Sequence, residues 1–239
     1  QEWVRHATHR YYIERFEHAF AEYVGSDYAI AVNSGTAALH LAMLSATEGR
    51  VRNHAIVPAV TFVATANAVS YTGALSLVSE VLPDTWCLSP QFLTGTGVDI
   101  IIPVHLYGQV ADMAAIMDRA LDLGALIIED AAEALGSRYK GRHVGTIGDV
   151  GIFSFYGNKL ITTGEGGMAV TNSAALADTI RRYMGQGEVP GQHYYHDRVG
   201  YNYRMSNIAA ALGLAQLERI NAVVDARAQA LAWYQDALP

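Results

Sequence analysis

The 239-residue sequence is poor in cysteine, in basic residues and in long apolar runs, and each shortage argues against a class of protein. Cys87 is the only cysteine and has no partner for an internal disulfide. The 16 Lys and Arg against 23 Asp and Glu give a net charge of −7, which argues against a nucleic-acid partner. No apolar run reaches the roughly 18 residues of a membrane-spanning helix, and the first residues lack the apolar core of a signal peptide. We therefore expect a soluble, cytoplasmic protein that does not bind a membrane.

The histidines and the cysteine do not predict a metal or thiol site. The nine histidines lack the spacing of metal ligands. His193 and His196 lie three residues apart in a tyrosine-rich stretch with no third ligand in view, so we predict no metal. Cys87 adjoins neither a histidine-rich stretch nor a helix start, which argues against a nucleophilic role.

The sequence has ample apolar content for a core, and its apolar residues alternate between two periodicities. The hydrophobic content is 51% and the chain has 22 glycines, so one large domain or slightly more is expected. Helical spacing predicts helices over 12–24 and 113–123, the second with Ile116, Met117, Ala120 and Leu121 toward the core. A further helix is expected from near Phe62, with Thr61 as its N-cap, and a long one over 208–238. Short apolar runs predict strands over 28–32, 55–57, 75–81, 99–104, 125–128 and 150–155. This alternation predicts an α/β fold with a largely parallel sheet.

A Ser-Gly-Thr turn follows the first predicted strand and opens an alanine-rich helix. The free N–H groups of that helix start, near Gly35 and Thr36, would form an anion site of the kind that often binds a phosphate. The alternative is an ordinary N-cap formed by Ser34 or Thr36.

Two charged residues also lie just beyond strand ends. Asp130 follows the strand 125–128, and Lys159 stands on a glycine-containing turn five residues after Ser154. Asp130 could be a helix cap or an ion-pair partner, and Lys159 could be a surface lysine on a turn. Ligands of parallel α/β sheets bind at the carboxyl ends of strands, however, which would bring these residues into one pocket.

Taken together, these residues fit the binding of pyridoxal 5′-phosphate. A lysine amine such as Lys159 forms a Schiff base with this cofactor, and an aspartate such as Asp130 keeps the pyridine nitrogen protonated. The helix start at Gly35 and Thr36 and the hydroxyl of Ser154 would hold the phosphate. An aromatic residue such as Phe62 would stack on the ring.

Seven segments in the same order resemble the sugar aminotransferase family (DegT/DnrJ/EryC1/StrS type), whose members are fold-type I pyridoxal-phosphate enzymes that act on nucleotide-linked keto sugars. The segments that carry the resemblance are 33–38, 57–67, 103–108, 129–136, 154–159, 162–167 and 200–205. Residues 156–159 and 162–165 most resemble the branch that aminates C4 of GDP-linked 4-keto-6-deoxymannose, the perosamine synthases.

The resemblance implies a large cofactor-binding domain with a mostly parallel mixed sheet sandwiched by helices. It implies Lys159 and Asp130 as catalytic residues. It implies a cofactor site made of Gly35, Thr36, Phe62, Asp130, Glu133, Ser154, Lys159 and Asn202. Glu133 would lie on the side of the cofactor's 3-hydroxyl group, and Asn202 would reach the phosphate of a partner subunit, so that a homodimer shares its active sites.

The implied reaction moves an amino group from an amino acid, with glutamate the expected donor, to a nucleotide-linked keto sugar. A truncated, catalytically impaired pyridoxal-phosphate-binding relative with a structural or regulatory role is one alternative. A sugar dehydratase on the same fold is another, although dehydratase variants of the family lack the lysine found here as Lys159. We expect residues 1–220 to form the large domain and 221–239 to begin a helix leading to a small C-terminal domain that is largely absent.

Overall fold

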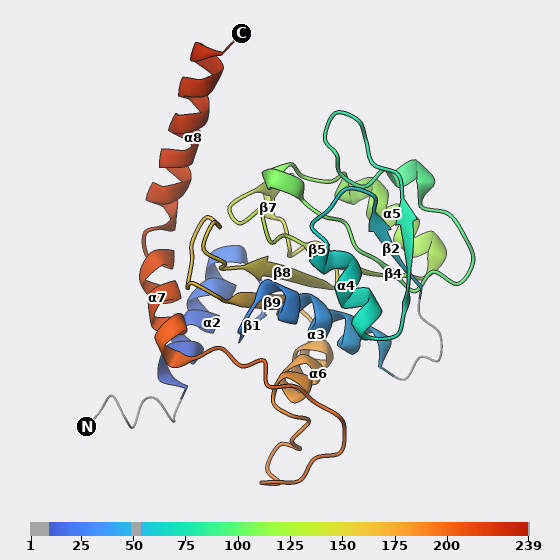
Figure 1. Cartoon of the computed structure of the whole chain (residues 1–239), viewed down its shortest axis with the longest axis vertical. Coiled ribbons are helices and arrows are strands. Elements are labelled where there is room, and N and C mark those ends of the chain that lie inside the picture. The colour runs from blue at the N-terminus through green and yellow to red at the C-terminus, as the bar shows by residue number, and fades with distance from the viewer. Residues whose placement is uncertain (1–9, 49–53, 239) are drawn as a thin grey trace.

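The computed structural model describes residues 10–48 and 54–238 and contains a seven-stranded sheet covered by helices on both faces (Figure 1). The strand order is β1-β9-β8-β5-β4-β2-β3. Neighbours are parallel at β2–β3, β2–β4, β4–β5 and β5–β8, and antiparallel at β1–β9 and β8–β9. The strands are β1 (Tyr28–Val32), β2 (His54–Pro58), β3 (Leu75–Ser79), β4 (Ile100–Ile101), β5 (Leu126–Asp130), β8 (Val150–Ser154) and β9 (Gly167–Thr171). The predicted α/β fold with a mostly parallel mixed sheet is therefore confirmed.

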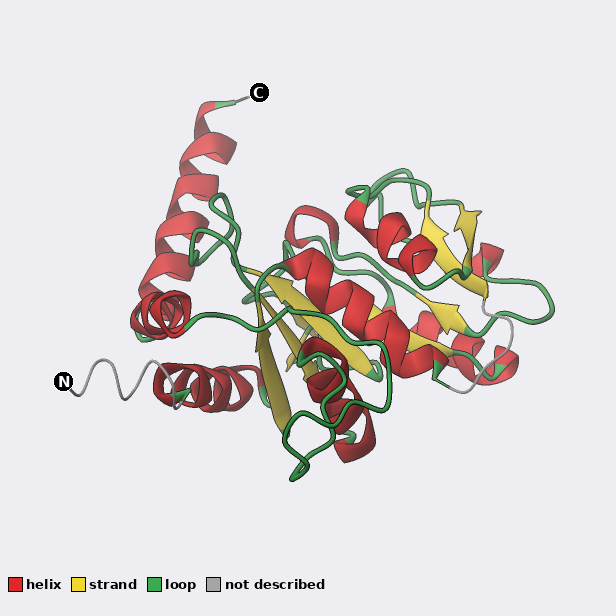
Figure 2. Cartoon of the chain, turned by 60° about the horizontal axis from the view of Figure 1, so that its bottom comes forward, coloured by secondary structure: helices red, strands yellow, loops and turns green. Residues whose placement is uncertain are grey.

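Alternating residues of each strand enter two different layers of core. Ile30, Ile128 and Ile152 face α3 (Gly35–Thr47), α4 (Ala64–Tyr71) and α6 (Ala174–Met184). Their neighbours Ile127 and Phe153 face the opposite side, which α2 (Tyr11–Val24), α5 (Met113–Leu123) and α7 (Asn207–Leu217) cover. Because successive side chains of a strand point to opposite faces, runs that are apolar throughout are what a sheet buried on both faces requires. The layered arrangement is visible in Figure 2.

The remaining elements are short or lie outside the sheet. The 3-10 turns η1 (Pro90–Phe92) and η2 (Leu106–Gly108) flank β4, and a small hairpin joins β6 (Arg138–Tyr139) to β7 (Arg142–His143). Helix α8 (Ile220–Ala237) projects away from the sheet and carries the C-terminus (Figure 1). The sequence analysis did not predict β9, which enters the sheet antiparallel to both of its neighbours.

Several predicted boundaries are wrong. The helix expected from near Phe62 begins at Ala64, and Thr61 is not its N-cap but pairs its hydroxyl with that of Thr65 at 2.9 Å. The strand expected over 99–104 is reduced to Ile100–Ile101, since Pro103 has no N–H to donate to a neighbouring strand. The strand expected over 75–81 ends at Ser79. The strand expected over 125–128 instead runs from Leu126 to Asp130, so that Asp130 belongs to the strand itself.

Two predictions about helices are also corrected. Met117 and Leu121 of α5 are 41% and 83% exposed, because the packed stripe of that helix is the narrower set Met113, Ile116 and Ala120. The single helix expected over 208–238 is two helices, α7 and α8. Leu217 and Ile220 are both buried in the core beneath α2, and the chain turns between them. A domain division near residue 220 stays a prediction.

Glycine allows β8 to lie close to the turn that precedes it. A Cβ atom at Gly151 would lie 1.9 Å from the carbonyl oxygen of Gly145, and Gly145 itself adopts φ +84°. The clash would be with backbone atoms, which cannot move away as the end of a flexible side chain does.

We predict that Gly151→Ala lowers the free energy of unfolding by about 3 kcal/mol or more, the upper end of the usual cost of overpacking. Gly157→Ala is the matched control, because a Cβ there has nothing within 4 Å, and it should change stability by about 0.5 kcal/mol at most. Urea unfolding followed by circular dichroism compares the two variants. Equal stability losses would show that the close approach at Gly151 is not a constraint.

Candidate active site

The carboxyl ends of six strands meet at one edge of the sheet. Since β9 is antiparallel to both β1 and β8, strand β1 points the same way as β8, β5, β4, β2 and β3. Ser34 follows β1, Asp130 ends β5 and Ser154 ends β8. These residues line one cavity of about 460 Å³. The edge therefore gathers the polar residues that the sequence placed after separate strands.

The turn after β1 presents free N–H groups to this cavity. Ser34 is the N-cap of α3, and its hydroxyl oxygen accepts a hydrogen bond from the N–H of Ala37 at 3.1 Å. The N–H of Ala38 donates to the carbonyl of Ser34 at 3.1 Å. The N–H groups of Gly35 and Thr36 precede these two donors and have no acceptor within the helix. The N-cap alternative is thus correct for Ser34, and the same geometry supplies an anion-binding helix start.

Glycine allows this helix start to lie against the end of β8. A Cβ at Gly35 would lie 2.9 Å from Cβ and 3.1 Å from Oγ of Ser154, closer than a larger residue allows. The Ser154 hydroxyl accepts a hydrogen bond from the N–H of Tyr156 at 3.3 Å. Two elements distant in sequence therefore place N–H groups and a hydroxyl around one small space that suits an anion.

Asp130 is a nearly buried carboxylate at the floor of the cavity, with 5% of the residue exposed. Its Oδ2 accepts a hydrogen bond from Thr65 Oγ1 at 2.7 Å and its Oδ1 one from the N–H of Ala132 at 3.2 Å. Burial raises the pKa of Asp130, and the bond from Thr65 opposes that shift only in part. No helix starts directly after Asp130, and within the described residues it has no ion-pair partner. Neither a helix cap nor an ion pair therefore explains the position of Asp130.

Lys159 is paired inside the cavity rather than free on the surface. Its Nζ lies 3.1 Å from Oε1 of Glu133, and the side chains of the two residues are 18% and 26% exposed. The other carboxylate oxygen of Glu133 accepts a hydrogen bond from the N–H of Tyr107 at 3.0 Å. Glu133 thus holds the amine of Lys159 in the cavity that Asp130 also lines.

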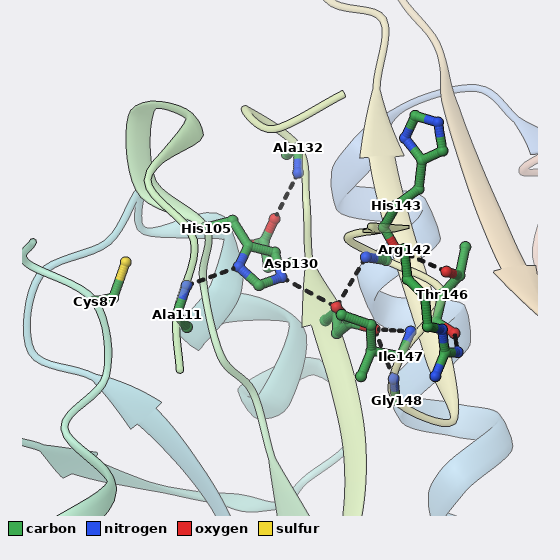
Figure 3. A network of polar contacts seen from close by, with 12 residues as sticks. Cys87, His105, Ala111, Asp130, Ala132, Arg142, His143, Thr146, Ile147 and Gly148 are labelled. Carbon is green, nitrogen blue, oxygen red and sulfur yellow. Dashed lines mark hydrogen bonds and ion pairs between the residues drawn. The ribbon is translucent and has the colours of Figure 1, made fainter. Parts of the chain in front are cut away.

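A second buried carboxylate, Glu129, holds the end of β5 in place. Figure 3 labels three of its partners, His105, Ile147 and Gly148. Its oxygens accept hydrogen bonds from three N–H groups of the turn before β8, those of Gly145, Ile147 and Gly148, at 2.6–2.8 Å. His105 Nε2 lies 3.1 Å from the same carboxylate. Because His105 Nδ1 accepts the N–H of Ala111 at 3.2 Å, the ring proton sits on Nε2 and points to Glu129. The sequence analysis did not single out Glu129, although a charged residue within an apolar strand was a usable signal.

Seven of the eight predicted cofactor residues line the cavity, and one does not. Gly35, Thr36, Phe62, Asp130, Glu133, Ser154 and Lys159 all contribute to its walls. The ring of Phe62 is 72% exposed. Asn202 lies on the surface, with its carbonyl 3.3 Å from the side-chain amide of Asn33, and is not among the lining residues. The prediction missed further lining residues, of which Thr61, Asn158 and Glu165 are polar.

A family model described as "DegT/DnrJ/EryC1/StrS aminotransferase family" matches residues 3–239. The chain belongs to this family. It is 46% identical over 230 residues to GDP-perosamine synthase of Caulobacter vibrioides, a match that covers 95% of this chain and 62% of that protein. The chain thus spans about three fifths of the length of this curated relative.

Two solved structures of similar proteins share the fold. A DegT DnrJ EryC1 StrS aminotransferase from Brucella abortus superposes with a TM-score of 0.89 at 33% identity and covers 95% of this chain and 63% of its own. Spr1654 of Streptococcus pneumoniae, solved in its PLP form, has a TM-score of 0.85 at 26% identity over 93% of this chain and 62% of its own. The expected fold-type I aminotransferase architecture is therefore confirmed.

The described residues contain neither a metal-ligand cluster nor a membrane-spanning helix. Residues 10–48 and 54–238 contain no group of three or more His, Cys, Asp and Glu side chains arranged to hold a metal ion. Over the same residues, no helix has both the length and the apolar character needed to cross a membrane.

The raised pKa of Asp130 predicts a dependence of stability on pH. Well below its ordinary pKa of 3.8 this carboxyl is protonated in both the folded and the unfolded state, so it does not change the free energy of unfolding. As pH rises through the raised folded pKa, the cost of ionising the buried carboxyl progressively lowers stability. Without cofactor at pH 7, Asp130→Asn should therefore be more stable than the unmodified protein by roughly 1–3 kcal/mol, and the gain should vanish in acid.

Chemical denaturation from pH 3 to pH 8 measures this difference. Asp118→Asn, which changes an exposed aspartate on α5, is the control and should show no such gain at neutral pH. A gain for Asp130→Asn that is the same at every pH would mean that burial of the charge is not its cause.

Proposed function

We propose that the protein transfers an amino group from an amino acid to a nucleotide-linked keto sugar, with pyridoxal 5′-phosphate as its cofactor. The observation that carries the proposal is the joint presence of Lys159, Asp130 and the Gly35–Ser154 anion site in one cavity of about 460 Å³. The family to which the chain belongs and the names of its relatives support the same chemistry.

The residues of the cavity fit the cofactor. Its phosphate needs donors without competing partners, which the N–H groups of Gly35 and Thr36 and the hydroxyl of Ser154 provide. A pyridinium N–H needs a buried carboxylate, and Asp130 is one that burial makes reluctant to ionise without a cation. Phe62, exposed at the cavity, is available to cover a ring.

The side chains of this chain then have distinct tasks. The bound cofactor supplies a ring that withdraws electrons from the substrate carbon. Asp130 holds the proton on the ring nitrogen, while Thr65 and Ala132 fix the direction of its two oxygens. Lys159 Nζ would hold the cofactor through its aldehyde carbon, and as a free amine it would move the proton at the amino acid's Cα. Glu133 accepts a hydrogen bond from this amine when it is not engaged and directs it into the cavity.

The similarity to GDP-perosamine synthase supports a narrower substrate within this proposal. We infer a GDP-linked 4-keto-6-deoxy sugar as acceptor and glutamate as amino donor. The walls of the cavity carry polar groups that can form hydrogen bonds with a sugar, namely the hydroxyls of Thr36 and Thr61 and the amide of Asn158.

The chain has only two lysines, Lys140 and Lys159, which makes a direct test possible. The purified protein with pyridoxal phosphate should show the visible absorbance of a lysine-bound cofactor, and borohydride should fix the cofactor to the peptide that contains residue 159. Lys159→Ala should lose both signals and essentially all transamination. Lys140→Ala, in the exposed β6–β7 hairpin, is the matched control and should keep them. Labelling at Lys140 alone would contradict the proposal.

A second arm separates cofactor binding from chemistry. Asp130→Asn should still bind pyridoxal phosphate but lose nearly all of the half-reaction with glutamate, because an amide does not hold the ring nitrogen protonated. Near-normal rates in this variant would rule out that task for Asp130.

We further propose that two copies of the chain share their sites. Asn202 is exposed beside the turn that leads into the anion site, yet it does not line the cavity of its own chain. Helix α7 packs on its own chain through Ala210, Leu214 and Leu217, but leaves Ile208 and Leu212 68% and 46% exposed. An apolar surface next to an unused amide suits a second copy related by a two-fold axis.

On this proposal, Asn202→Ala weakens pyridoxal phosphate binding by about 10-fold, the usual effect of losing one hydrogen bond to a charged group. Dilution should release cofactor and subunits together, because only the dimer completes the phosphate site. Sedimentation at several concentrations, followed at the cofactor's absorbance, measures both. Asn221→Ala on exposed α8 is the control. A monomer that retains its cofactor would show the shared site to be wrong.

A further inference from the structure

The cavity at Lys159 continues into a second one that α8 borders. This second cavity has a volume of about 350 Å³ and shares Glu133, Ser154, Asn158 and Lys159 with the first. Tyr107 and Leu160 add to its walls, and Arg227 of α8, an exposed residue, also lines it. A space next to the reactive amine thus has a guanidinium group on its wall.

The position of Arg227 follows from how α8 leaves the core. Ile220, the first residue of α8, is buried, and Val224 one turn later packs against Gly136. A Cβ at Gly136 would lie 3.2 Å from Val224 Cγ2, and Gly136 adopts φ +93°, so a glycine is needed there on both counts. Arg227 is three residues beyond Val224 and therefore on the same face of the helix. The packing that fixes Val224 directs Arg227 toward the cavity.

The guanidinium of Arg227 has no partner among the residues that the structure describes. Glu133, the one acid among the residues lining the second cavity, already uses one oxygen for Lys159 and the other for the N–H of Tyr107. Across both cavities the only cationic side chains among the lining residues are Lys159 and Arg227, and the acids are Asp130, Glu133 and Glu165. Of these two cations, Lys159 is paired with Glu133, so Arg227 is the one whose charge is left for an anionic ligand.

We propose that Arg227 binds a carboxylate of the amino-acid donor in this second cavity. The inference rests on the proposed function, because it assumes that an amino acid delivers its amine to the cavity of Lys159. In an amino acid the α-carboxylate is two bonds from the amine, so the site needs a cation beside the reacting centre. Arginine is suited to this task, since its planar fork donates two parallel hydrogen bonds to a carboxylate.

The diphosphate of a nucleotide sugar is the other anion that a guanidinium could bind. The volume of the second cavity favours the smaller ligand, because about 350 Å³ holds an amino acid but not a sugar with its nucleotide. The assignment to the donor is therefore separable from binding of the acceptor.

The test compares Arg227→Gln, Arg227→Lys and Arg219→Gln. Arg219 precedes α8, is exposed and lines neither cavity, so it controls for the loss of an arginine in this region. The half-reaction with L-glutamate is followed through the cofactor's absorbance. Arg227→Gln should raise the KM for glutamate by about 10- to 100-fold with a smaller change in kcat, as expected for the loss of a charge-assisted contact made throughout the reaction. Arg227→Lys should fall between, and Arg219→Gln should match the unmodified protein.

A binding measurement does not depend on turnover. Glutarate has two carboxylates and no amine to transfer, and its affinity for the cofactor-loaded protein is measured by titration calorimetry. Arg227→Gln should weaken glutarate binding by the same factor as the KM for glutamate. An unchanged glutarate affinity in this variant overturns the assignment.

The acceptor half-reaction distinguishes the two anions. The KM for the nucleotide-linked keto sugar should be unchanged in Arg227→Gln; a rise confined to this KM would assign Arg227 to the diphosphate and overturn the proposal. If the unmodified protein reacts with no amino acid, the proposed function fails, while the glutarate titration still decides whether Arg227 binds carboxylates.

Discussion

The buried carboxylate of Glu129 is the constraint on which the edge of the sheet depends. An ion in the protein interior costs several kcal/mol unless nearly all of its lone pairs accept hydrogen bonds. Glu129 meets this condition with the ring of His105 and three N–H groups of the turn before β8 (Figure 3). The loop after β4, strand β5 and the approach to β8 are thereby joined at one point. Asp130 is the next residue in the chain, so its position is set by the same contacts.

Holding the carboxyl of Asp130 in this buried position lowers the stability of the folded protein. The carboxyl is nearly buried, its two partners are neutral groups, and burial raises its pKa. Such a group favours a ligand that brings a proton or a positive charge to it. Lys159 does not serve as this counter-charge, since it pairs with Glu133 on another part of the wall. Two acids thus have separate surroundings: Glu133 orients the amine, and Asp130 is the acid to which we assign the ring nitrogen in the proposed function.

The sequence predicted which residues share a cavity better than it predicted the boundaries of the elements. Gly35, Asp130, Ser154 and Lys159 could be found because each follows or ends a short apolar run, and parallel strands bring their carboxyl ends together. The break between α7 and α8 could not be predicted, because the spacing of Leu217 and Ile220 is also compatible with one continuous helix. The break becomes evident only in the structure, where both residues are buried in the core beneath α2. Met117 was misplaced for a similar reason, since helical periodicity does not say how wide the packed stripe is.

The residues that sequence reasoning missed are those whose partners lie far away in the chain. Nothing local to Thr65 indicates a hydrogen bond to Asp130, 65 residues later, and nothing local to Arg227 indicates a cavity formed by Tyr107 and Lys159. For residues next to strand ends, the position in the site follows from the regular geometry of the sheet. For a residue on a helix that projects away from the sheet, the role follows only from tertiary contacts, here the packing of Val224 against Gly136. The cofactor chemistry can therefore be inferred from motifs, whereas the choice of amino donor depends on contacts that no motif contains.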